Sequence, residues 1–473
     1  MSDSAAALSK STFIRGVQCL KSLYLNKNRP FLRDRLSAEQ LAKFKRGHEI
    51  GHLARDLYPG GINCAPGHPS QYRAALEKTA KSIAENKPVI YEAAFRHEDI
   101  LVLLDILMKE GSVWHALEVK SSLHISETYL IDAALQYYVI KGSGLTPETI
   151  RIVHMNPAYR LGGSLDIKQL FVTTDVTEKV LALQEYIGIQ IKKSREALTL
   201  KKSPDIPVGR HCRHPYPCDF TGHCWKHIKS DSVFSISGLP FDRRCALYEN
   251  GYTEIADIPE ESLPKQEQII LRAHRTQRNY FNSDRLHKRL AFGDHPQFVS
   301  FFAFRSALPL FEGHRPFESV IFAAASTDGT HSPQSFTAIP GSNPEPEIRN
   351  FLRQILSSGR SVVYYGSEQT RLAFDESGIF SRDDRLINLA EVFEDRDFYT
   401  PGMDPDGGLF ETAAALGLSG SKTDRISEIM QGVRYLNITS ENREETLKVI
   451  REEIQEAVVL TSRIYKFLNE LIS

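Results

Sequence analysis

Hydrophobic and polar positions along the chain predict strands and helices in turn. Residues 100–108, ILVLLDILM, are apolar enough for a buried strand, and residues 114–122, WHALEVKSS, form a second extended run. The polar break at Lys109, Glu110 and Gly111 predicts a turn between these runs. The pattern therefore indicates two adjacent strands within a hydrophobic core.

The same kind of pattern on either side of these runs predicts a mixed α/β fold. Residues 1–9 are small and polar and are expected to form a disordered lead-in. Helices are predicted for residues 11–30 (capped by Ser11 or Thr12), 37–60 (as a pair), 70–85, 124–145 and 176–200, and strands for residues 88–95 and 150–159.

Three charged residues interrupt the two central runs. Asp105 lies within the first run, and Glu118 and Lys120 lie in the second. Side chains alternate along a strand, so Glu118 and Lys120 share one face while Val119 points to the other. Two carboxylates and a lysine on one sheet face predict a divalent-metal site with a cation beside it. A surface hairpin with a solvated Glu–Lys pair is the alternative, and the apolar flanks favour the metal site.

Length and charge limit the class of protein. A chain of 473 residues predicts two or three domains, and a net charge of −1 gives no overall attraction to nucleic acid. Any nucleic-acid surface must therefore be local, and the basic N-terminal segment is the candidate. No signal peptide or long apolar span occurs in the sequence, so we expect a cytoplasmic protein without a membrane segment.

The six cysteines are clustered in a way that predicts metal binding. Cys212, Cys218 and Cys224 follow one another with five residues between each pair, and Cys19 lies far upstream. A zinc ribbon would need closely spaced pairs, whereas iron–sulfur clusters are commonly held by four cysteines. Zinc and mixed histidine ligation remain open, because four histidines surround the trio: His211, His214, His223 and His227. The remaining cysteines are expected to be plain buried residues: Cys64 and Cys245.

The Asp-x(n)-Glu-Val-Lys pattern, together with one cysteine before it and three after it, resembles RecB-like PD-(D/E)XK nucleases of the iron–sulfur type. These include AddB-like and CRISPR-adaptation nucleases, and the resemblance covers residues 10–228. It implies that Mg²⁺ or Mn²⁺ is held by Asp105, Glu118 and the carbonyl of Val119, and that Lys120 orients or activates water. It also implies a 4Fe–4S cluster on these ligands: Cys19, Cys212, Cys218 and Cys224.

Further family positions match in part. Gln136 occupies the glutamine of a Gln-x-x-x-Tyr pattern, but Ile140 stands in the tyrosine position. The family pattern Gly-x-x-x-His is not kept after Gly47; His52 is a candidate metal ligand, and an exposed helical histidine is the alternative. Glu92, in the strand predicted for residues 88–95, is a second candidate ligand facing the site of Asp105.

The rest of the chain resembles other nucleic-acid modules. Residues 229–292 are predicted to form a helical linker, either a helix–hairpin–helix-like element or a plain linker. Residues 293–473 resemble a DnaQ-like domain with the ribonuclease-H fold, of an uncharacterised bacterial family. The acidic positions of that family read Ala303-Phe304-Arg305, Asn388 and Ala457 here, leaving Glu368 alone. We therefore expect a degenerate domain, because two metals cannot be held without clustered carboxylates.

Together these features predict an α/β protein with a restriction-endonuclease-like domain, a helical linker and a ribonuclease-H-like domain. The expected activity is Mg²⁺- or Mn²⁺-dependent hydrolysis of DNA phosphodiesters by an exonuclease or by an enzyme directed to single strands or ends. DNA is the expected partner, with a helicase or another DNA-processing protein as a further candidate. The alternative is a non-catalytic nucleic-acid-binding subunit that keeps the nuclease fold as a platform.

Overall fold

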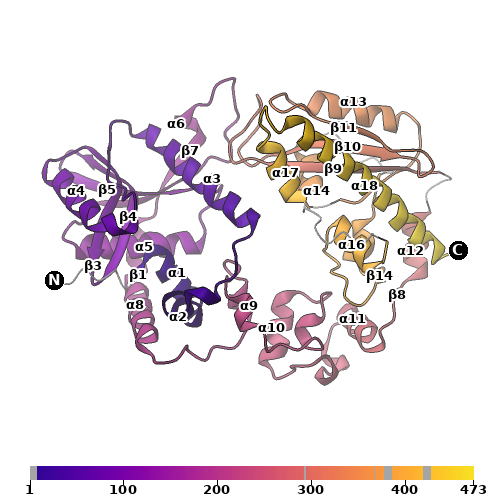
Figure 1. The fold of residues 1–473 in the computed structure, drawn as a ribbon, viewed down its shortest axis with the longest axis horizontal. Helices are drawn as coiled ribbons and strands as arrows, with labels where there is room; N and C mark the ends of the chain where they lie inside the picture. The colour runs from indigo at the N-terminus through magenta and orange to yellow at the C-terminus, as the bar shows by residue number, and fades with distance from the viewer. Residues whose placement is uncertain (1–7, 292–294, 367, 378–385, 419–427) are drawn as a thin grey trace. The chain divides into compact units, whose positions relative to one another are not determined.

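A computed structural model describes residues 8–291, 295–366, 368–377, 386–418 and 428–473 (Figure 1). The chain forms two compact α/β units, one of residues 1–227 with 312–316 and the other of residues 228–311 with 317–473. Residues 229–292, predicted from sequence as a linker, belong to the second unit. No helix within the described ranges is both long and apolar enough to span a membrane.

The first unit contains a seven-stranded mixed sheet. Strand β4 runs antiparallel to β3 and to β5, and β7 runs antiparallel to β6. The pairs β2–β3, β1–β4 and β5–β6 are parallel. The order is β2-β3-β4-β5-β6-β7, with β1 paired to β4. The strands are β1 (Leu8–Ser9), β2 (Ile62–Asn63), β3 (Val89–His97), β4 (Ile100–Glu110), β5 (Val113–Lys120), β6 (Thr149–Met155) and β7 (Phe171–Asp175).

Helix α5 forms the crossover between the parallel strands β5 and β6, so it must pack on a face of the sheet. Its Ala133, Ala134, Tyr137 and Ile140 are buried in the core beneath it. The helices of this unit are α1 (Lys10–Gln18), α2 (Leu20–Asn28), α3 (Ala38–Ala54), α4 (Tyr72–Ala84), α5 (Glu127–Gly142), α6 (Ile167–Leu170), α7 (Thr177–Ala182), α8 (Gln184–Thr199) and α9 (Thr221–Cys224).

Four expectations about local structure were wrong. The end of the predicted lead-in is strand β1, since apolar Leu8 is fully buried against β4. The helix predicted for residues 11–30 begins earlier, capped by Ser9, and breaks at Cys19, whose backbone is extended. The pair predicted for residues 37–60 is one α-helix followed by a single 3₁₀ turn, and the helix predicted for residues 176–200 is divided at Leu183.

The second unit has a five-stranded sheet of order β11-β10-β9-β12-β13. Strands β9, β12 and β13 are parallel, and β10 runs antiparallel between β9 and β11. The long helix α18 packs across this sheet, with Thr461 bonded to Ser300 of β9 at 3.0 Å between hydroxyl oxygens. The strands are β8 (Tyr280–Phe281), β9 (Gln297–Arg305), β10 (Ser319–Thr327), β11 (Gln334–Thr337), β12 (Val362–Tyr364), β13 (Leu386–Asn388) and β14 (Phe398–Tyr399).

The segment that precedes this sheet is helical, as the sequence pattern predicted. Helices α10 and α11 are separated by two short 3₁₀ turns, Ile255–Asp257 and Glu260–Ser262. Strand β8 of this segment pairs with β14 in a separate two-stranded sheet. The helices of the second unit are α10 (Phe241–Glu249), α11 (Lys265–Thr276), α12 (Ser283–Leu290), α13 (Glu345–Leu356), α14 (Glu368–Ser377), α15 (Ala390–Glu394), α16 (Leu409–Ala415), α17 (Glu428–Leu436) and α18 (Arg443–Glu470).

Candidate functional site

Three carboxylates lie in one row across neighbouring strands of the first unit. The register of β3 and β4 pairs Tyr91 with Ile106 and Ala93 with Leu104, so Glu92 lies opposite Asp105. Strands β4 and β5 pair as far as Ile106 and Leu117, so the next residues of that row are Asp105 and Glu118. The row therefore brings Glu92, Asp105 and Glu118 together on adjacent strands.

The backbone is distorted at this row. Glu92 has a φ of 51°, in the left-handed region that side chains other than glycine seldom adopt. In β4, the residues in the core beneath α5 are Ile100, Val102 and Leu104 and then Leu107, so the alternation changes phase next to Asp105. The Asp105 Oδ2 atom accepts a hydrogen bond from the backbone N–H of Val119 at 2.7 Å. Local strain of this kind is concentrated at functional sites in proteins.

Glu118 is the centre of the polar contacts. Its side chain is buried, and its Oε1 atom accepts hydrogen bonds from the Nζ atoms of Lys10 and Lys120, each at 2.7 Å. Its Oε2 atom accepts a hydrogen bond from the Nε2 atom of Gln136 at 2.8 Å. Burial by itself would raise the pKa of Glu118, but the two ammonium groups outweigh this and hold that pKa well below its ordinary value.

Asp105 is in the opposite electrostatic situation. Burial, followed by the negative charge of Glu118, raises the pKa of Asp105 to about 8. Its hydrogen-bond donor is a backbone amide, whereas Glu118 contacts two ammonium groups. The two carboxyl groups therefore differ in protonation near neutral pH, as is common in sites where carboxylates share a small volume.

Two residues of this site were missed in the sequence reasoning. Asp132 on α5 is buried, and its Oδ2 atom lies 2.5 Å from Lys120 Nζ and 3.8 Å from Lys10 Nζ. Its place one helical turn before Gln136, in an otherwise apolar helix, was the signal that could have revealed it. Lys10 gave no such signal, because it follows a segment that reads as a polar lead-in.

The donor set fits a hard divalent cation. The buried oxygens Asp132 Oδ1 and Gln136 Oε1 have no hydrogen-bond partner, and they add to the carboxylates of Asp105 and Glu118. Oxygen ligands of this type are those that Mg²⁺ and Mn²⁺ prefer. The backbone carbonyl of Val119 lies between Glu118 and Lys120 in the same strand, where the sequence resemblance placed a further ligand.

The other two candidate ligands have different surroundings. The Oε1 atom of Glu92 accepts a hydrogen bond from Arg55 Nη2 at 2.8 Å, so its charge is balanced from the end of α3. His52 is exposed near the end of α3. Among the described residues, His48, one turn earlier, lines the cleft beside Lys120 and Asp132.

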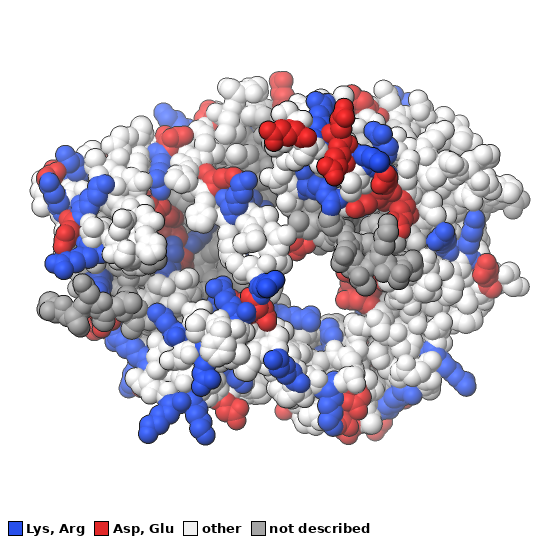
Figure 2. Space-filling view, viewed as in Figure 1, with Lys and Arg blue, Asp and Glu red and all other residues white. Residues whose placement is uncertain are grey.

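A cleft of about 700 Å³ opens from the carboxylate site. Its lining is basic and aromatic, with Lys10, Lys43 and Lys120 on its walls. The Nζ atom of Lys43 lies 5.6 Å from the ring centre of Tyr216, and Phe44 is 52 % exposed. This basic character is local, because the net charge of the chain is −1. The face drawn in Figure 2 likewise carries both positive and negative side chains.

Asp219 lines the same cleft next to Cys218, which belongs to the cysteine site. Its carboxylate forms ion pairs with Arg15 and Arg33, and both guanidinium groups line the cleft. Those ion pairs offset the burial that would raise the pKa of Asp219 and leave it below its ordinary value. Cys218, the residue before Asp219, also lines the cleft.

The four cysteines singled out in the sequence line one small cavity. Cys19, Cys212, Cys218 and Cys224 all line it, and Cys19 reaches it because the helix breaks there. Burial raises the pKa of Cys224 to about 11, and the other three thiols oppose its ionisation further. A metal or cluster that binds thiolates fits this donor set. The other two cysteines, Cys64 and Cys245, are buried, as expected.

Within the described ranges, no group of three or more His, Cys, Asp or Glu side chains is spaced to surround a single ion. Metal binding at either place is therefore a proposal that rests on the chemistry of the donor atoms.

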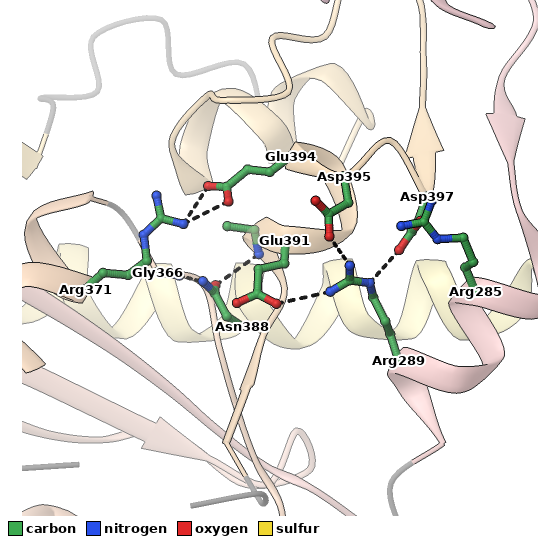
Figure 3. Close-up of polar contacts among 10 residues, drawn as sticks. Arg285, Arg289, Gly366, Arg371, Asn388, Glu391, Glu394, Asp395 and Asp397 are labelled. Carbon is green, nitrogen blue, oxygen red and sulfur yellow. Dashed lines mark hydrogen bonds and ion pairs between the residues drawn. The ribbon is translucent and has the colours of Figure 1, made fainter. Parts of the chain in front are cut away.

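In the second unit, the residues that stand in place of the expected acids contribute to packing. Ala303 and Ala457 are buried apolar residues. Asn388 Oδ1 accepts hydrogen bonds from the backbone N–H groups of Gly366 and Ala390, at 2.8 Å and 3.1 Å (Figure 3). The side chain of Glu368 lies outside the described residues.

An ion-pair network lies next to Asn388 (Figure 3). The guanidinium group of Arg289 on α12 contacts Glu391, Asp395 and Asp397, and Arg285 Nε lies 2.7 Å from Asp397 Oδ1. Asp397 is fully buried, so these arginines compensate a charge that would otherwise be costly to bury. The network fixes α12 to the segment that follows β13.

Comparisons with known proteins add little to this description. No family model matches the chain, and no curated protein matches it. Among solved structures, one described as "Crystal structure of SSO0001" is similar, with a TM-score of 0.21 and 11 % sequence identity. The similarity covers 47 % of this chain and 88 % of that chain, and it is too weak to support any argument.

Proposed function

We propose that the first unit is a metal-dependent nuclease of the PD-(D/E)XK type. The observation that supports this most strongly is the row of Glu92, Asp105 and Glu118. Lys120, on the same face of β5 as Glu118, lines a basic cleft. The mixed sheet with a crossover helix, and Gln136 bonded to Glu118, are consistent with the resemblance seen in the sequence.

The expected ligands of the divalent ion are Asp105, Glu118 and the carbonyl of Val119. When bound, Mg²⁺ or Mn²⁺ would polarise the phosphate and lower the pKa of the attacking water. Lys120 neutralises negative charge that develops on the phosphate oxygens as water adds to phosphorus. Gln136 holds Glu118 in place through its amide. The attacking water releases a proton to solvent as its oxygen bonds to phosphorus, the P–O bond to the leaving oxygen breaks, and that oxygen takes up a proton from solvent.

The residues that line the cleft are evidence for a single strand of nucleic acid as the substrate. Single-strand sites combine basic groups that follow the phosphates with aromatic rings on which bases stack. Lys43 and Arg33 supply positive charge, while the exposed rings of Phe44 and Tyr216 supply stacking surfaces. We take DNA as the substrate, cleaved as a single strand or from an end.

The cysteine site would serve the same unit as a clamp. A 4Fe–4S cluster on the four cysteines would join the start of the unit to a segment nearly two hundred residues later, which is a large loop closure. The second unit fits the role of a degenerate DnaQ-like domain that contributes packing or binding. Its sheet order and its apolar Ala303 and Ala457 support this role.

Cleavage of labelled DNA tests the proposal. Glu118→Gln and Lys120→Ala in the full chain should each lower Mg²⁺- or Mn²⁺-dependent cleavage of single-stranded DNA by about a hundredfold or more. Glu77→Gln, at an exposed residue of α4, is the matched control and should cleave like the wild type. Unchanged cleavage in the Glu118 variant would reject the site, and activity that persists in both variants would indicate a second centre.

The alternative, a binding subunit without catalysis, is favoured by one observation. Both ammonium groups near Glu118 donate to its Oε1 atom, and Gln136 donates to its Oε2 atom, so a metal would have to displace a donor to bind either oxygen. Under this alternative the wild-type protein would bind single-stranded DNA without cleaving it at any divalent metal concentration. The same labelled DNA, followed by fluorescence anisotropy, separates the two functions.

A further inference from the structure

Lys10 occupies a position in the carboxylate site that the sequence reasoning did not assign. Its Nζ atom donates to Glu118 Oε1 at 2.7 Å and lies 3.8 Å from Asp132 Oδ2. Lys120 contacts the same two oxygens, at 2.7 Å and 2.5 Å. The two ammonium groups and two carboxylates therefore form one compact set of charges.

We propose that Lys10 is a second lysine of the active site, an internal counter-ion for Glu118 and Asp132 that a divalent cation must displace. This inference rests on the proposed nuclease function and concerns the same site.

The fold places Lys10 there with several independent contacts. Strand β1 pairs with β4 through Leu8 and Ile100, which places the start of α1 next to β4, where the Lys10 side chain reaches Glu118. A capping box between Ser9 and Thr12 makes Lys10 the first residue of α1. A positive charge at a helix N-terminus is unfavourable with respect to the helix dipole. The carboxylates of Glu118 and Asp132 supply the compensating interaction.

The other end of α1 is fixed as well. Gly16 packs so closely that a Cβ atom there would lie 2.7 Å from Ser194 Oγ. Arg15 forms two hydrogen bonds with Asp219, and Cys19 ends the helix at the cysteine cavity. A nine-residue helix spans about 14 Å, so α1 connects the cysteine site directly to the carboxylate site.

The role of Lys10 follows from the oxygen that it shares with Lys120, which is Glu118 Oε1. Glu118 Oε1 accepts from both lysines, and a divalent cation bound to that oxygen would lie within a few ångströms of two ammonium groups. Like charges at that distance repel strongly in a buried site. Lys10 has 31 % of its side chain exposed and lines the cleft, whereas Lys120 is 15 % exposed. Lys10 is therefore the lysine that can move away, into the cleft where the phosphates of a strand would lie.

Manganese binding in the absence of DNA tests this role without relying on activity. Lys10→Met keeps the length of the side chain and removes its charge, so isothermal titration calorimetry should show Mn²⁺ binding about tenfold tighter than in the wild type. Lys10→Arg keeps the charge and should retain the wild-type Kd. Lys141→Met, at an exposed residue of α5, is the control for a change in net charge and should also retain it.

The outcomes separate this inference from the proposed function. If Glu118→Gln weakens Mn²⁺ binding while Lys10→Met leaves it unchanged or weaker, the metal site stands and the role of Lys10 is refuted. If wild type, Lys10→Met and Glu118→Gln all fail to bind Mn²⁺, both the metal site and the counter-ion role are refuted. Circular dichroism on each variant checks that it is folded. If Lys10→Met does not fold, Lys10→Arg provides the test, and tighter Mn²⁺ binding in Lys10→Arg would overturn the proposal.

Discussion

Replacing Asp105 with asparagine should make the first unit more stable, even though it removes a residue of the proposed active site. The carboxyl group of Asp105 has its pKa raised from 3.8 to about 8, first by burial and then by the charge of Glu118. An asparagine has the same shape, and its amide oxygen can still accept the hydrogen bond from Val119 N–H. The substitution therefore removes an ionisable group without opening a cavity.

The size of the effect follows from the two pKa values. At about pH 7 the unfolded chain has Asp105 ionised, while the folded protein keeps it protonated, so folding takes up a proton. Each pH unit above 3.8 costs about 1.36 kcal/mol, which gives about 4 kcal/mol at neutral pH. A unit of this size changes its Tm by roughly 2–4 °C for each kcal/mol, so Asp105→Asn should raise Tm by roughly 8–16 °C.

The pH dependence provides the sharper test. The raised pKa means that the wild type loses stability as the pH rises from about 4 to about 8 and loses no more above that, whereas Asp105→Asn lacks this contribution. Differential scanning calorimetry of both proteins in EDTA, at several pH values within this window, measures the difference. Asp205→Asn, at an exposed residue of the same unit, is the control. A Tm difference between Asp105→Asn and wild type that does not grow with pH would refute the reasoning.

Two further predictions concern the cysteine site and the second unit. Cys19→Ser should remove visible colour and iron from anaerobically purified protein and make the first unit sensitive to protease, while Cys64→Ser should do neither. A content of about one zinc and no iron in the wild type would refute the cluster. Arg289→Ala should destabilise the second unit by about 3 kcal/mol, because among the described residues Arg285 is then the remaining ion-pair partner of fully buried Asp397. Arg451→Ala, at an exposed residue of α18, is the control. Calorimetry should show a lower Tm for Arg289→Ala than for the control, and equal Tm values would contradict the prediction.

The central part of the first unit could be predicted from sequence. The apolar runs of β4 and β5, the break at Gly111 and the helical spacing of α5 each follow from local periodicity. Asp105, Glu118 and Lys120 stood out because charge within a buried strand is costly unless it has a partner. Their alternation predicted one shared face, and the structure places all three in the same group of contacts.

Other features depended on tertiary structure. In the sequence Cys19 lies within a continuous helical pattern, whereas in the structure its backbone is extended and it lines a cavity with Cys212, Cys218 and Cys224. The helix of His52 was predicted, but which of its histidines borders the cleft depends on the rotation of α3.

Local sequence by itself determined most of the strands and helices of the first unit, because hydrophobic periodicity is a property of neighbouring residues. It did not determine that Lys10 meets Glu118 from 108 residues away, or that Asp132 turns toward Lys120. Those contacts require β1 to pair with β4 and α5 to cross over the sheet. The left-handed backbone of Glu92 likewise has no local signal. Only the folded chain brings these charges together, since each contact depends on closing a long loop and on the neighbours that then compensate it.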